Sequence, residues 1–138
     1  MAFKIQRKNR IKEELQLCHA SGDVALSIDV DINVDEIAGR LSKAQETLRE
    51  AQVRLKRDTS SPEAMEAYGN AIGEFFKVIF GEENAGKILD FYEGNYSEML
   101  LDIFPFINEA IMPAIRNASA SRKAQLLEAA KAAKRMGR

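Results

Sequence analysis

The stretch AGKILDFYEGNYSEMLLDIFPFINEAIMPAI, residues 85–115, decides how this chain folds. It is the densest run of large apolar side chains in the sequence, and they are spread along its whole length: Ile88, Leu89, Phe91, Tyr92, Tyr96, Met99, Leu100, Leu101, Ile103, Phe104, Phe106, Ile107, Ile111, Met112 and Ile115. Burial of apolar surface is the dominant favourable term in folding. We therefore predict that this stretch is the central packing element, against which the other helices lie.

A strict alternation of apolar and polar residues over 24–34 predicts a half-buried strand. Its apolar positions share one face: Val24, Leu26, Ile28, Val30, Ile32 and Val34. Residues 20–23 have turn chemistry, with Gly22 free to adopt positive φ, and upstream Ile11, Leu15 and Leu17 share one parity. The two segments predict a β-hairpin, and Phe3 and Ile5 either begin a third strand or extend the first. Because a two-stranded hairpin is marginal alone, its apolar face must pack on helices or on another subunit's sheet.

The residues after the strand predict a helix with a heptad seam over residues 37–55. Its apolar positions recur at steps of four and three: Ile37, Leu41, Ala44, Leu48, Ala51 and Leu55. Either an amphipathic helix packs this seam on its own core, or the seam is shared with another subunit. Self-association is expected through the strand, the seam or both, at Ile28, Val30, Ile32, Leu41 and Leu48.

Ser61 and Pro62 predict the start of a second helix, and Gly81 predicts its end. An apolar stripe runs along it: Met65, Tyr68, Ile72, Phe75, Phe76 and Ile79. Gly69 and Gly73 lie one turn apart, and this spacing lets another helix approach closely.

A short helix is expected from about residue 83 to 92, closed by Gly94, and Ser97 is expected to cap the next one. Pro105 should kink or break that helix, and Pro113 should do so again near its end. Phe104 and Phe106 flank the first bend. The bend either wraps the core or forms a recognition corner.

Charge is unevenly distributed although the net charge is −1. Residues 58–115 carry a balance of −9, whereas residues 116–138 carry a balance of +6. The alanine-rich basic end, residues 119–138, predicts a helix with a thin apolar face, loosely docked on the rest. Such asymmetry raises the question of a charged partner, although the signature of a nucleic-acid binder is weak.

These patterns together predict an α+β fold in a single domain, residues 1–138. A hairpin occupies 1–34, a helical core occupies 35–118, and the basic helix follows, with four to five helices in all. No segment approaches the roughly 20 apolar residues of a membrane span, and the N-terminus has no signal-peptide run.

Residues that carry chemistry are scarce. Cys18 and His19 are the only cysteine and histidine, and adjacent strand residues point to opposite faces. The spacing Asp29-x-Asp31-x-Asn33 resembles a calcium loop, but Val34 and Arg40 stand where that loop needs glycine and glutamate. We therefore expect no catalytic, cofactor-binding or metal-binding residues, and no enzyme.

Three pieces carry a family resemblance: SIDVDINVDEIAGRL (27–41), the run 66–115, and the basic C-terminal end. The segments FGEEN (80–84), FYEGNY (91–96) and DIFPFINE (102–109) are its characteristic parts. These pieces resemble tail assembly chaperone-type proteins encoded among the tail genes of siphophages and prophages of Gram-positive bacteria. The resemblance implies a cytoplasmic factor in the bacterial host that binds the tape measure protein, or another tail protein, and is absent from the finished virion.

Two alternatives remain open. The protein could be a structural or adaptor protein that stays in the phage tail, or a small DNA-associated regulator that uses the basic tail. For the chaperone reading, aromatics around Gly94 and Pro105 are the expected contacts with a hydrophobic helical client: Tyr92, Tyr96, Phe104 and Phe106. Aromatic side chains supply much contact area at low entropic cost.

Overall fold

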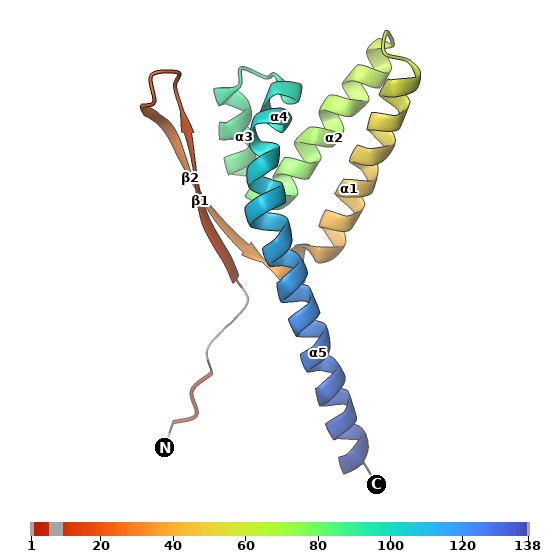
Figure 1. The fold of residues 1–138 in the computed structure, drawn as a ribbon. Helices are drawn as coiled ribbons and strands as arrows, with labels where there is room; N and C mark the ends of the chain where they lie inside the picture. The colour runs from red at the N-terminus through yellow and green to blue at the C-terminus, as the bar shows by residue number, and fades with distance from the viewer. Residues whose placement is uncertain (1, 6–9, 138) are drawn as a thin grey trace.

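The computed structural model describes residues 2–5 and 10–137, which form an antiparallel hairpin followed by a mostly helical body (Figure 1). The elements in chain order are β1 (Arg10–Cys18), β2 (Val24–Asn33), α1 (Val34–Arg57), α2 (Pro62–Phe80), α3 (Glu82–Phe91), α4 (Tyr96–Phe106), the π-helical segment η1 (Ile107–Ile111) and α5 (Met112–Met136). Helix accounts for 71% of the described residues and strand for 14%. The predicted α+β class is confirmed.

The hairpin packs one face on the helices and presents the other to solvent. Ile11 pairs with Ile32 and Leu15 pairs with Ile28, so their side chains share the inner face, which contacts α1, α2 and α3. Gly22 has φ +94°, as the tight turn requires. Within the described residues the sheet has two strands only. Phe3 and Ile5 lie outside both and are exposed, so neither a third strand nor an extension of β1 forms there.

Helices α1 and α2 form an antiparallel pair along the predicted seam. The seam residues from Ile37 to Ala51 are buried, and Leu55 at its end is half-buried. The Ser61 hydroxyl accepts a hydrogen bond from the Ala64 N–H at 3.2 Å, so the predicted start of α2 is confirmed. Met65 departs from the predicted stripe because it is exposed near the end of the pair. Val34, predicted as the last strand residue, begins α1 instead.

Helix α2 is the centre of the core. Ile72 and Phe76 are fully buried between the hairpin, α1 and the later helices, and burial of one such side chain contributes about 1.5–3 kcal/mol. The stretch 85–115 packs around it, through Ile88, Met99, Ile103, Ile107, Ile111 and Ile115. The stretch therefore fills the core as predicted, but it wraps α2 rather than forming the centre itself.

The predicted breaks in the later helices are partly wrong. Asn95, not Ser97, caps α4, because its side-chain oxygen accepts a hydrogen bond from the Glu98 N–H at 3.0 Å. Pro105 lies inside α4 and does not break it. The helix continues through η1, where the Met112 N–H donates to the Ile107 carbonyl five residues back, and passes into α5 at Met112, just before Pro113. Residues 96–136 are thus one continuous helical rod (Figure 1).

The last part of the rod leaves the body. Every described residue from Lys123 onward is exposed, and Figure 1 shows α5 running away from the other helices toward the C-terminus. We call residues 119–136 the arm. An ion pair between Arg122 and Asp35, 3.1 Å apart, joins its base to the start of α1.

Candidate interaction surface

The outer side of α4 carries large apolar side chains that the core does not cover. Leu101 is 74% exposed and Phe104 is 50% exposed, and they lie three residues apart, on one face of the helix. This exposure follows from periodicity: Met99, Leu100 and Ile103 take the core-facing positions, so Leu101 and Phe104 must point outward.

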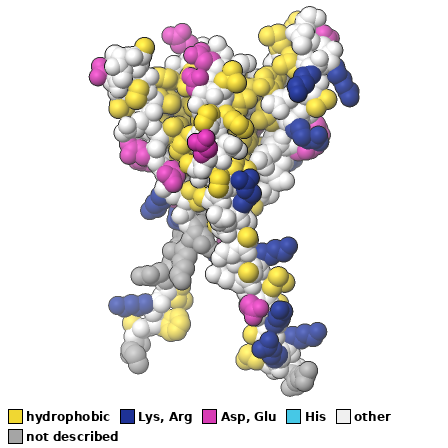
Figure 2. All heavy atoms as spheres, in the orientation of Figure 1, with side chains coloured by type: hydrophobic (Ala, Val, Ile, Leu, Met, Phe, Trp, Pro, Cys, Tyr) yellow, Lys and Arg dark blue, Asp and Glu magenta, His cyan; other side chains and the backbone are white. Residues whose placement is uncertain are grey.

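A row of carboxylates runs along the Leu101 side of this apolar pair. Glu98, Asp102 and Glu109 are all exposed, on α4 and η1. Figure 2 shows acidic and hydrophobic side chains together on the front of the body, over α4. We call Leu101, Phe104, Glu98, Asp102 and Glu109 the α4 face. It combines an apolar contact with negative charge along one edge.

The structure separates the four aromatics that the sequence grouped as client contacts. Phe104 alone is widely exposed, whereas Tyr92 is 8% exposed and belongs to the core. Phe106 is half-buried and stacks on Phe80, with ring centroids 6.4 Å apart. Tyr92 therefore presents little surface for a partner, and Phe106 is partly covered by the helices of the protein's own body.

Tyr96 is half-buried for a specific reason: its ring lies across the two glycines of α2. A Cβ at Gly69 would lie 3.1 Å from Tyr96 Cδ2, and one at Gly73 would lie 3.2 Å from Cε1. The predicted close approach of another helix at these glycines is confirmed, and the approaching helix is α4.

Tyr92 shows how the core meets the α4 face. Burial, together with the charge of the nearby Asp102 carboxylate and its hydrogen bond with the phenol, raises the pKa of Tyr92 to about 12. A raised phenol pKa means that the neutral hydroxyl is the favoured form. Asp102 on the α4 face is therefore held next to the buried phenol of Tyr92.

The five side chains expected to mediate self-association all face the interior. Ile28, Val30 and Ile32 fill the inner face of the hairpin, and Leu41 and Leu48 pack in the seam between α1 and α2. They are covered by the protein's own helices and are not available on its surface. The seam is thus used within one chain, as the first of the two interpretations expected.

The arm is the second exposed apolar surface. Leu126 is 62% exposed and Leu127 is 55% exposed, and a hollow of about 340 Å³ separates them from Val34 and Ala38 at the start of α1. Lys123, Lys131, Lys134 and Arg135 make the arm basic. Figure 2 shows basic side chains on this part of the chain.

The sequence predicts Phe104 as a contact but places Leu101 in the core stretch. The exposure of Leu101 follows only once Met99 and Leu100 are known to be buried. Leu126 and Leu127 were recognised only as a thin apolar face. The available signal was two leucines in a segment otherwise alanine-rich and basic.

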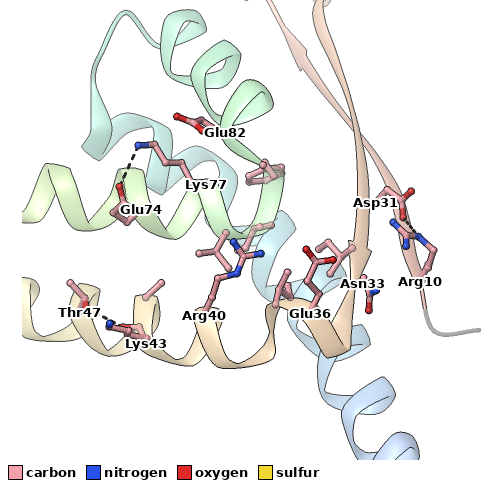
Figure 3. A pocket seen from close by; sticks show the side chains of 17 residues that line it. Arg10, Asp31, Asn33, Glu36, Arg40, Lys43, Thr47, Glu74, Lys77 and Glu82 are labelled. Atoms are coloured by element: carbon pink, nitrogen blue, oxygen red, sulfur yellow. Dashed lines mark hydrogen bonds and ion pairs between the residues drawn. The ribbon is translucent and has the colours of Figure 1, made fainter.

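A charged cleft of about 670 Å³ lies between β2, α1 and α2 (Figure 3). Its ionisable side chains balance, with four cations and four anions: Arg10, Arg40, Lys43, Lys77, Asp31, Glu36, Glu74 and Glu82. Arg10 pairs with Asp31 at 2.8 Å and Lys77 with Glu74 at 3.3 Å. The residues that line the cleft include no cysteine, histidine or serine.

Cys18 and His19 lie at the end of β1, beside the hairpin turn. The Cys18 thiol is exposed at the end of β1, and the His19 ring lies 6.3 Å from the Phe91 ring. Across the described ranges, 2–5 and 10–137, no three histidine, cysteine or acidic side chains cluster as metal ligands would. No helix in that part of the chain is long and apolar enough to cross a membrane.

The fold and its surfaces define a small α+β protein, a hairpin on a helical body with two exposed amphipathic helix faces. The chain belongs to a family of unknown function, DUF6673, whose sequence profile matches residues 22–136. No curated protein and no solved structure matched the chain.

Proposed function

We propose that this protein is a non-enzymatic assembly factor of the tail assembly chaperone type. In this role it binds the tape measure protein in the cytoplasm of the bacterial host during phage tail assembly. The observation that supports the proposal is the α4 face, where Leu101 and Phe104 stand exposed beside a row of carboxylates.

The chemistry of the face suits a long helical client. A hydrophobic helix left bare in water tends to aggregate, and an exposed apolar face can cover part of it. The carboxylate row favours client segments with basic side chains and opposes acidic ones. One such small face binds weakly, so many copies along the client would hold it and still be displaced when tube subunits arrive.

The proposed contacts therefore move from the predicted aromatic set to the α4 face. Phe104 is common to both. Leu101 replaces Tyr92, Tyr96 and Phe106, which are engaged in the protein's own packing.

Co-expression with a tape measure fragment tests the proposal. Leu101→Gln with Phe104→Gln should leave the far-UV circular dichroism spectrum unchanged and reduce the amount of soluble client. Met65→Gln with Val53→Gln is the matched control, since it removes two exposed apolar side chains from the far ends of α1 and α2. A folded α4-face variant that keeps the client as soluble as the wild type would refute the assignment.

The exposed basic arm supports a second candidate, a DNA-associated regulator. Four basic side chains from Lys123 to Arg135 on an exposed helix would contact phosphates, and retention on DNA would then fall steeply with salt. Retention at physiological salt would favour this candidate.

A third candidate is an adaptor protein that stays in the phage tail. Mass spectrometry of purified particles should then find the protein, whereas the chaperone proposal expects the protein to be absent from them.

A further inference from the structure

We propose that the arm of one copy docks on the α4 face of a second copy. Both surfaces belong to this chain, so the contact does not depend on the identity of any client.

The arm continues a packing stripe that is covered only at its beginning. Along the rod, Ile111 and Ile115 are buried and Ala118 is half-buried, on the side that faces α1 and the core. The same helical face continues into the arm at Leu126, Ala129 and Ala133, which are exposed. A helix normally covers such a stripe with another element, but beyond Arg122 the start of α1 faces the arm only across the hollow at Val34 and Ala38 and leaves Leu126 62% exposed.

Charge identifies the occupant. Lys123, Leu127 and Lys131 follow one another at steps of four, and Lys134 extends the same row. On the α4 face, Glu98 and Asp102 lie four residues apart and Glu109 extends that row. The basic row and the acidic row each span eleven steps of chain, about 16 Å along a helix.

The apolar parts match in the same way. Leu126, Ala130 and Ala133 run beside the lysine row, and Leu101 and Phe104 run beside the carboxylate row. Small alanines on the arm allow close approach of two helices, while the leucines supply apolar contact for Phe104 and Leu101. One docking geometry would therefore satisfy both the apolar and the charged halves of each surface.

The contact must form between two chains. Helix α4, η1 and the arm are successive parts of one continuous rod, so the arm points away from its own α4 face (Figure 1). A helix cannot fold back on itself without a break, and residues 96–136 contain none. A second copy brings the complementary surface without any change in the fold.

A consequence is competition. The arm presents apolar side chains flanked by basic ones, which is the chemistry expected of a client segment. Copies joined through the arm would cover the α4 face until a client displaces the arm.

The experiment is sedimentation velocity on the full chain without any client, from micromolar to hundreds of micromolar concentration. The wild type should associate. Leu126→Gln with Leu127→Gln (the arm variant) and Leu101→Gln with Phe104→Gln (the face variant) should each weaken association about tenfold or more. Glutamine keeps helix propensity close to that of leucine, and circular dichroism checks the fold. Met65→Gln with Val53→Gln should associate as the wild type does.

Mixing the variants makes the test specific. The arm variant retains an intact α4 face and the face variant retains an intact arm, so an equimolar mixture should recover a one-to-one complex. Charge reversal is a second form of the mixing test. Lys131→Glu with Lys134→Glu should abolish association, and mixing this variant with Glu98→Lys with Glu109→Lys should restore association.

Several results would overturn the proposal. A wild type that stays monomeric throughout, a face variant that associates normally, or a mixture that stays monomeric would each do so. Arm variants that lose DNA retention while association is unchanged would assign the arm to nucleic acid instead. Because no client is present, these outcomes are independent of whether the co-expression test succeeds.

Discussion

Gly69 and Gly73 determine how closely α4 lies on α2. With only hydrogen at these positions, the Tyr96 ring rests on the backbone of α2, at distances that a methyl group would shorten to 3.1 and 3.2 Å. Glycine inside a helix costs about 1 kcal/mol relative to alanine. The close packing of Tyr96 is what offsets this cost.

We predict that the cost of alanine at both glycines depends on Tyr96. The change in unfolding free energy caused by Gly69→Ala with Gly73→Ala should be about 1–3 kcal/mol less favourable with Tyr96 present than in a Tyr96→Ala background. In that background the added helix propensity is gained without a clash. Urea unfolding of the wild type, the double glycine variant, Tyr96→Ala and the combined variant measures this coupling between the glycines and Tyr96. Equal effects in the two backgrounds would mean that the ring moves aside freely.

Because of Tyr92, the unfolding free energy should depend on pH in the alkaline range. The folded pKa of about 12 lies above the ordinary value of 10.0, so the folded state favours the protonated phenol. That contribution is fully present below about pH 10 and is lost as the pH rises toward about 12. Tyr92→Phe should therefore lower the pH dependence of the unfolding free energy between these values.

Urea melts at several alkaline pH values measure this slope for both proteins. Lysines titrate in the same range in both, so the difference isolates the phenol. An unchanged slope would show that Tyr92 is not the titrating group.

At the scale of elements, η1 keeps one long helix aligned with the core. Ile103, Ile107, Ile111 and Ile115 are spaced by four residues and all are buried. In an α-helix each such step drifts by about 40°, since four residues exceed the 3.6-residue turn. A wider π turn takes up this drift, and its hydrogen bonding also suits Pro113, which has no N–H to donate to residue 109.

Deletion of the exposed Glu109 should convert η1 to regular helix and leave everything after it in nearly the same orientation, because a π turn holds one residue more than an α turn. Ile111 and Ile115 should then stay in the core, whereas a rotation by one residue, about 100°, would remove them at a cost of about 2–5 kcal/mol each. Thermal unfolding followed by circular dichroism measures the stability. Glu109→Ala is the control, and it should unfold near the wild-type temperature because the side chain is exposed. A deletion variant that is much less stable than that control would contradict this role of η1.

At the scale of the whole molecule, charge is divided between the body and the arm. The acidic balance of residues 58–115 lies in α2 to η1, and the basic balance of residues 116–138 lies in the end of the rod. The net charge of −1 hides this division, so the molecule is close to neutral overall but strongly polar along its length.

Association between copies should therefore weaken as salt rises. The Debye length falls from about 30 Å at 0.01 M to about 3 Å at 1 M, which screens exposed charges progressively. Light scattering across that range should show a falling apparent mass for the wild type. The apparent mass of Lys131→Glu with Lys134→Glu should depend little on salt. Association that strengthens with salt would indicate a purely apolar contact.

The sequence by itself determined the hairpin, the α1 seam, the start of α2 at Ser61 and the class of the fold. Each depends on local periodicity or on a cap within a few residues, which neighbours in the chain fix directly. Only the tertiary structure decided that Tyr92 is buried while Leu101 is exposed, that the Tyr96 ring covers two glycines, and that η1 carries the helix past Pro105 and Pro113. The physical reason is that such outcomes depend on which distant element covers each side of a helix. In α4 almost every position is apolar, so the pattern could not say which side faced the core.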